Sequence, residues 1–253
     1  MKVALITNPS PVAHYFAGKI SSEIPLDGIY IEAGKKRSAS RPTLRKILSG
    51  IKRNLLGNQT LADLERRMER QARRRYFPDF SRTIRSTLMP ETTVDIHAEE
   101  FLEHLRKEQY DMIVLFGTSI VKKPLLEIPR CATLNIHTSL LPYYKGTMPE
   151  FWQLYYEDYA HCGSTVHYVE SGVDTGNILL QEPVEVEAGD TFFDLRYKNI
   201  LKAIELLPEA ITLASSGEPG VVQPSVTQEV FRASMVTDEK KRELYRRLGW
   251  RIS

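Results

Sequence analysis

Cysteine is scarce in this chain, which contains only Cys131 and Cys162 among 253 residues. Two thiols are too few for the disulfide framework of a small secreted domain, so their scarcity favours a reducing compartment. No apolar run approaches the roughly 20 residues that a membrane-spanning helix needs. The apolar stretch at residues 3–7 soon meets Asn8 and Pro9, unlike a signal peptide. The sequence therefore predicts a soluble cytoplasmic protein without a membrane span.

Several motifs that would define a function are also missing. The chain has no GxGxxG fingerprint after its first apolar run, no GxxxxGK[ST] phosphate loop and no GxSxG nucleophile elbow. Its six His and two Cys do not fall into a metal-ligand spacing. We therefore expect no nicotinamide site of the usual kind, no P-loop chemistry and no metal site.

Strand and helix patterns alternate along the chain. The predicted strands are residues 3–7, 28–32, 92–96, 111–116, 132–136, 163–169 and 177–186. The predicted helices are residues 11–22, 98–108, 190–215 and 237–248, with a short one around Pro124. This alternation is typical of an α/β fold with a doubly wound, mostly parallel sheet. A composition of 42% hydrophobic and 26% charged residues is that of an ordinary globular protein.

Basic residues are concentrated in one stretch. Residues 35–75 contain 14 Lys and Arg against three acidic residues, and the spacing within residues 35–80 predicts a basic helical insertion. Its helices are either simply solvated, or they form a surface for an anionic nucleotide, an anionic lipid or nucleic acid. Nucleic acid is the least favoured partner, because aromatic side chains for base stacking come only at Tyr76 and Phe77.

These patterns divide the chain into two parts. Residues 1–215, which include the insertion, form the predicted catalytic domain. Residues 216–253 form a C-terminal extension that begins rich in turn residues and ends in the helix predicted at 237–248. This last helix packs on the core or forms a contact in an oligomer, and the sequence leaves both alternatives open.

Polar side chains follow the strand at 132–136, where a parallel sheet binds its ligands. Asn135 and His137 are two residues apart and project to one face of the extended chain. An amide donor beside an imidazole suits oxyanion stabilisation and proton transfer; the alternative is a pair that merely caps a loop. Further along, Asp174 follows the strand at 163–169, and its carboxylate either orients the imidazole or forms an Asx turn.

The stretches LNIHTSLLPYYKGTMPEFW (residues 134–152) and GSTVHYVESGVDTGNILLQEPVEV (residues 163–186) resemble the 10-formyltetrahydrofolate-dependent formyltransferases. That family includes enzymes acting on glycinamide ribonucleotide, methionyl-tRNA and amino sugars. The resemblance extends over about residues 92–200. It implies a Rossmann-like formyltransferase fold and an enzyme of one-carbon metabolism.

The resemblance also implies roles for individual residues. The catalytic trio would be Asn135, His137 and Asp174, with Thr165 near an active-site water and His167 as the family's strand histidine. The formyl donor would be 10-formyltetrahydrofolate. The residues expected to line its site are Phe116, Gly117, Thr118, Ser119, Ile120, Val121, Leu140, Leu141, Ser171, Gly172 and Val173.

The amine that accepts the formyl group is inferred by elimination. The Asn8-Pro9-Ser10-Pro11 turn lacks the glycine-rich phosphate loop of the glycinamide ribonucleotide enzymes, and about forty residues after 215 are few for the C-terminal domain of the methionyl-tRNA enzymes. We therefore expect a small or medium anionic metabolite, such as a nucleotide-linked amino sugar. The alternatives are an aminoacyl-tRNA, another amine, or a non-catalytic relative that binds folate or RNA.

Three further residues flank the expected acceptor side. Tyr143 would stack on a base or a sugar, although packing is an equal alternative for this side chain. Lys145 would meet a phosphate, and Glu150 would contact the substrate amine.

Overall fold

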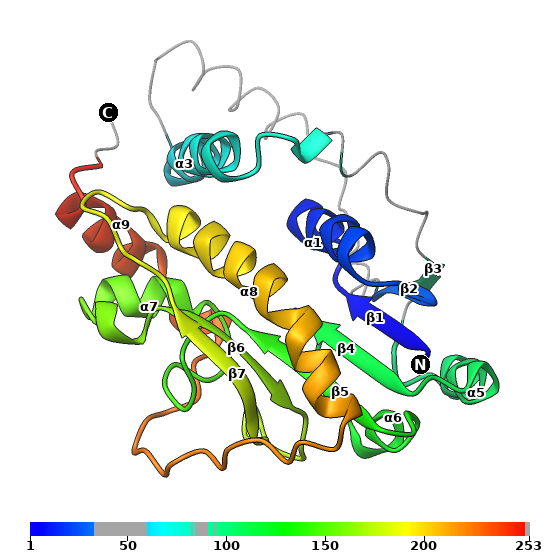
Figure 1. The fold of residues 1–253 in the computed structure, drawn as a ribbon. Coiled ribbons are helices and arrows are strands. Elements are labelled where there is room, and N and C mark those ends of the chain that lie inside the picture. Colours follow the sequence, from blue (N-terminus) through cyan, green and yellow to red (C-terminus); the bar gives the residue numbers. More distant parts are fainter. Residues whose placement is uncertain (33–59, 82, 84–90, 94, 251–253) are drawn as a thin grey trace.

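One sheet organises the molecule (Figure 1). The computed structural model describes residues 1–32, 60–81, 83, 91–93 and 95–250. Within these residues, seven strands lie in the order β3-β2-β1-β4-β5-β6-β7. The strands are β1 (Val3–Thr7), β2 (Gly28–Glu32), β3 (Glu91–Thr93), β4 (Met112–Phe116), β5 (Ala132–His137), β6 (Gly163–Tyr168) and β7 (Ile178–Pro183). The pairs from β3 to β5 are parallel, and β6 and β7 are antiparallel, which confirms the predicted mostly parallel sheet.

Helices cover both faces of the sheet, as the doubly wound prediction requires. They are α1 (Pro11–Glu23), α3 (Leu61–Tyr76), α5 (Glu99–Glu108), α6 (Lys123–Leu126), α7 (Pro149–Tyr155), α8 (Phe192–Ser215) and α9 (Asp238–Arg247). The central strand β1 shows why two layers are needed: Val3 and Leu5 pack with α1 and α8, while Ala4 and Ile6 pack with α5 and α6. A strand that is buried on both faces reads as a continuous apolar run.

The predicted strand at 92–96 is shorter in the structure. It is observed as Glu91–Thr93, and residues 95–98 form a turn that leads into α5. The Asp95 carboxylate accepts a hydrogen bond of 2.8 Å from the His97 backbone N–H. A local Asx contact of this kind competes with strand pairing, which explains the difference.

Only part of the predicted basic insertion is described. Residues 33–59 lie outside the described residues, and α3 confirms the helical prediction for residues 61–76. Thr60 and Asp63 form a capping box at its N-terminus. The apolar stripe of α3 faces α8, and the Glu65 carboxylate accepts a hydrogen bond of 2.7 Å from the Tyr245 hydroxyl of α9. The described part of the insertion is therefore packed onto α8 and α9.

The helices of the described residues include no candidate for a membrane span. Not one of them is both long enough and apolar enough to cross a membrane.

Candidate active site

A cavity of about 500 Å³ opens beyond the carboxyl ends of β4 and β5. Its walls include the loop after β4, the start of α7, the loop between β6 and β7, and the first turns of α8. This is the edge of a parallel sheet at which ligands bind in open α/β folds. The predicted trio Asn135, His137 and Asp174 lines it, together with His167.

The pairing of β5 with β6 sets two of these side chains next to each other. In the antiparallel register Asn135 lies opposite His167, and His137 lies opposite Thr165. The Asn135 Nδ2 atom is 3.0 Å from the His167 Nε2 atom. Residues directly opposite on one face of a sheet are in contact range, so β6 positions a partner for the β5 amide.

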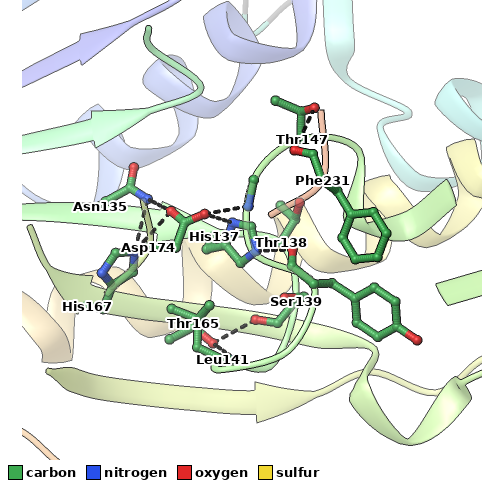
Figure 2. Close-up of polar contacts among 12 residues, drawn as sticks. Asn135, His137, Thr138, Ser139, Leu141, Thr147, Thr165, His167, Asp174 and Phe231 are labelled. Carbon is green, nitrogen blue, oxygen red and sulfur yellow. Dashed lines mark hydrogen bonds and ion pairs between the residues drawn. The ribbon is translucent and has the colours of Figure 1, made fainter. Parts of the chain in front are cut away.

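Asp174 is the residue on which the polar contacts converge (Figure 2). It adopts a left-handed backbone conformation with φ 51°, and its Oδ2 atom accepts a hydrogen bond of 2.7 Å from the Gly146 backbone N–H. The same oxygen lies 3.5 Å from His137 Nδ1, and Oδ1 lies 3.4 Å from Asn135 Nδ2. The structure thus brings together the three side chains that the sequence analysis predicted, from positions far apart in the chain.

The hydrogen bonds of His137 determine where its protons lie. Its Nε2 atom is 2.9 Å from the Tyr144 carbonyl oxygen, which can only accept, so Nε2 carries a hydrogen. A second proton on the imidazole would therefore lie on Nδ1 and face the Asp174 carboxylate. Both side chains are buried, since that of His137 is only 6% exposed and that of Asp174 is 12% exposed.

His167 is held neutral next to this pair. Burial lowers its pKa to about 4, although the Asp174 carboxylate opposes the shift. Its Nδ1 atom donates to the Tyr168 carbonyl oxygen at 2.7 Å, which leaves Nε2 as the acceptor for the Asn135 amide. A neutral imidazole with a fixed tautomer therefore orients the Asn135 side chain, with its NH₂ group toward Asp174.

The loop at residues 116–121, which the resemblance assigns to the donor, also lines the cavity. Gly117 has φ +67°, and a Cβ atom there would lie 2.4 Å from Asn8 Nδ2. Asn8 Nδ2 donates to the Gly117 carbonyl oxygen at 3.0 Å. At the end of β2, the Glu32 carboxylate accepts from both the backbone N–H and the hydroxyl of Ser119, at 2.8 and 2.7 Å. Neighbouring strand ends thus fix the shape of this loop.

The other predicted site residues divide into two groups. All six residues of 116–121, together with Gly172, Val173 and Glu150, line the cavity. The remaining predicted residues are outside the set of lining residues: Leu140, Leu141, Tyr143, Lys145, Thr165 and Ser171. Thr165 is fully buried, and its hydroxyl donates to the Ser139 carbonyl oxygen at 2.7 Å. It therefore holds the turn after β5, and Tyr143 stacks on His161 with 3.7 Å between ring centroids.

Two groups of residues at the site were not found from the sequence. Arg196 of α8 and Glu69 of α3 line the cavity. Gln223 and Phe231, from the C-terminal extension, support its loops: Gln223 Nε2 donates to the Asp174 carbonyl oxygen at 2.9 Å, and the Phe231 carbonyl oxygen accepts from the Thr147 N–H at 2.9 Å. Arg196 and Glu69 lie within charged amphipathic helices, so their types and spacing gave no signal of a site.

The sequence of this chain matches a known protein family. The model of the formyl transferase family matches residues 57–211, which is more than half of the chain. The chain therefore belongs to the formyl transferase family. Its fold is that of the solved members, which confirms the resemblance of the two motif stretches.

Curated relatives match the chain over part of their length. GDP-perosamine N-formyltransferase of Brucella melitensis is 35% identical over 133 residues, which are 52% of this chain and 51% of that protein. Methionyl-tRNA formyltransferase of Caldicellulosiruptor saccharolyticus is 32% identical over 156 residues, which are 61% of this chain and 47% of that protein. The chain thus spans about half the length of the curated relatives that it matches.

Solved structures share the fold at lower identity. Glycinamide ribonucleotide transformylase 1 of Symbiobacterium toebii is 22% identical with a TM-score of 0.57, covering 89% of this chain and 95% of that one. An N-formyltransferase of Helicobacter canadensis, solved with folinic acid and dTDP-3-aminofucose, is 15% identical with a TM-score of 0.56, covering 94% and 73%.

Proposed function

We propose that this protein is an enzyme that transfers a formyl group from 10-formyltetrahydrofolate to the primary amine of a nucleotide-linked amino sugar. The observation that carries the proposal is the convergence of Asn135, His137 and Asp174 in one cavity. Membership of the formyl transferase family supports the reaction class. The relative named GDP-perosamine N-formyltransferase supports the type of acceptor.

Each member of the trio has a role that follows from its contacts. The donor supplies the formyl group when it is bound. Asp174 takes the proton that the attacking amine loses, and His137 returns a proton to the nitrogen from which the formyl group departs. The Asn135 N–H stabilises negative charge on the formyl oxygen. Its contact with Asp174 is long at 3.4 Å, so this N–H can turn to a substrate oxygen.

The donor end of the cavity fits a pterin through main-chain groups. The loop at 116–121 and residues 172–174 both line this cavity. A pterin ring presents hydrogen-bonding edges that match backbone N–H and carbonyl groups, and the left-handed Gly117 lines the cavity. The residues present therefore fit a folate donor of this kind.

The experiment that tests the proposal is an acceptor panel. The purified protein is incubated with 10-formyltetrahydrofolate and, separately, GDP-perosamine, dTDP-3-aminofucose, glycinamide ribonucleotide or charged initiator methionyl-tRNA. Release of tetrahydrofolate and the mass of the product are measured. We expect a formylated product with an amino sugar and not with the other two acceptors. Turnover of methionyl-tRNA alone, or of none of the four, would contradict the proposed function.

A further inference from the structure

Arg196 donates few of the hydrogen bonds that its guanidinium can form with the described residues. It lies in the second turn of α8 and lines the cavity, with its side chain 31% exposed. Its Nε atom is 3.5 Å from the Glu150 Oε1 atom, and its guanidinium lies over the Phe192 ring at 5.2 Å from the centroid. Among the described residues, no protein group accepts a hydrogen bond from its two Nη atoms.

Glu150 explains why this arginine is held in place. Its side chain is only 2% exposed, although α7 begins just before it at the rim of the cavity. A buried carboxylate must be paired, and Arg196 supplies the positive charge. Nε faces Glu150 and the guanidinium lies over the Phe192 ring, so both Nη groups remain for a ligand. A planar fork of N–H donors binds phosphate or carboxylate oxygens in pairs.

Glu69 gives the same wall a second kind of charge. It reaches the cavity from α3 and forms no ion pair with Arg196 among the described contacts. Both side chains act on the Tyr197 hydroxyl: burial raises its pKa to about 12, Glu69 adds to the shift, and Arg73 and then Arg196 oppose it. The two charges therefore line one cavity without forming an ion pair with each other. Such a wall suits a ligand that carries an anionic group and an amine together.

We infer that Arg196, braced by Glu150, binds an anionic oxygen group of the amine acceptor, either phosphate or carboxylate. The inference rests on the proposed function for the identity of the ligand as the acceptor. It adds the residue that selects an anionic acceptor and the part of the cavity where that group lies. The loop at 116–121 follows β4, whereas Arg196 lies in α8, so the expected donor and acceptor contacts come from different elements of the lining.

Anion binding can be tested without turnover. Isothermal titration of the full chain with pyrophosphate and with succinate separates the two sources of anionic oxygen, at about 0.15 M salt so that the exposed basic helix is screened. We expect the wild type to bind at least one of them, and Arg196→Ala to weaken that binding about 10- to 100-fold. The matched control is Lys202→Ala, which removes a cation of α8 that pairs with Glu182 and Glu205 outside the cavity, and it should bind as the wild type does.

Two results would overturn the inference: a wild type that binds neither anion, or an Arg196→Ala variant with unchanged affinity for both. In the formylation assay Arg196→Ala should raise the acceptor KM about 10- to 100-fold, with kcat within about twofold and the Kd of folinic acid unchanged. Formylation of an amine with an unchanged KM removes the inference and leaves the proposed function. If Arg196→Ala loses pyrophosphate binding but the wild type formylates no amine, the proposed function is removed and the anion site remains.

Discussion

At the scale of the residue, the cavity depends on how protons are distributed around Asp174. Its carboxylate faces the Gly146 N–H, the Asn135 amide and the His137 imidazole. His167 is neutral, because burial lowers its pKa to about 4. Two histidines thus surround one carboxylate, and the neutral His167 contributes no positive charge to it.

The role of Asp174 is tested by Asp174→Asn. The amide keeps the shape but cannot take a proton, so we expect kcat for formyl transfer to fall about 10²- to 10⁴-fold. The Kd of folinic acid should change little. Asp158→Asn is a matched control, because Asp158 pairs with His161 at 2.8 Å outside the cavity. An Asp174→Asn variant as active as Asp158→Asn would refute the assigned role.

The neutral state of His167 has a consequence for stability. The unfolded chain takes up its proton near the ordinary value of 6.5, whereas the folded protein does so near 4. Between these pH values the unfolded state binds more protons, so the free energy of unfolding falls as the pH is lowered. The slope from this residue is at most about 1.4 kcal/mol per pH unit.

The matched variant is His167→Gln, whose side chain can accept from Asn135 but does not titrate. We expect its free energy of unfolding to depend less steeply on pH than that of the wild type over the same interval. Urea unfolding at a series of pH values measures both slopes. Equal slopes would show that His167 does not carry a depressed pKa.

At the scale of the element, the loop at 116–121, the proposed donor site, is positioned by the ends of strands. The carboxylate of Glu32, at the end of β2, accepts two hydrogen bonds from Ser119, and Asn8, just after β1, contacts Gly117. The sequence predicted β1 and β4 correctly because buried parallel strands are continuous apolar runs. It could not predict the Glu32 contact, since this joins residues 87 positions apart.

Removal of the contact between Glu32 and Ser119 should change the kinetics of the formyl donor only. We expect Glu32→Ala to raise the KM for 10-formyltetrahydrofolate several-fold while kcat and the acceptor KM stay close to the wild type, because the loop loses two charge-assisted hydrogen bonds. Steady-state kinetics with each substrate varied in turn measures this split. Glu127→Ala serves as the control, since its pair with Lys123 is on the surface. A change in kcat alone would contradict this explanation.

At the scale of the whole molecule, the C-terminal extension is part of the site's construction. The Phe231 backbone bonds to Lys145 and Thr147, and its ring stacks at 4.8 Å on Trp152. Gly146 has φ +100°, and a Cβ atom there would lie 2.1 Å from the Phe231 carbonyl oxygen. The extension therefore fixes the very glycine whose N–H contacts Asp174.

This brace can be tested by Phe231→Ala. The ring is 3% exposed, so its removal should lower the free energy of unfolding by about 3–5 kcal/mol. The kcat should fall as well, because the loop that carries Gly146 loses its support. Thermal unfolding and turnover are measured beside Val230→Ala, whose side chain is 39% exposed and should tolerate the change. A variant as stable and active as the control would contradict the brace.

Some features of the site could be predicted from the sequence and others could not, and both outcomes have physical reasons. The trio was predictable because its residues follow strand ends in a recognisable order, and α3 was predictable from its capping residues and apolar spacing. Arg196 was not predictable, because an arginine in a long helix is usually solvated. Gln223 and Phe231 lie beyond the residues that the family model matches, so neither a motif nor a period marked them.

The Phe231 backbone contacts the loop at 145–147, and this contact can form only late in protein synthesis. Every residue of the trio is translated well before position 231, so the sheet can form on the ribosome while its reactive edge still lacks its last support. A nascent chain should therefore pass through a stage in which the sheet is folded but the protein is not yet active. Activity should begin when the segment around Phe231 packs against the loop at 145–147.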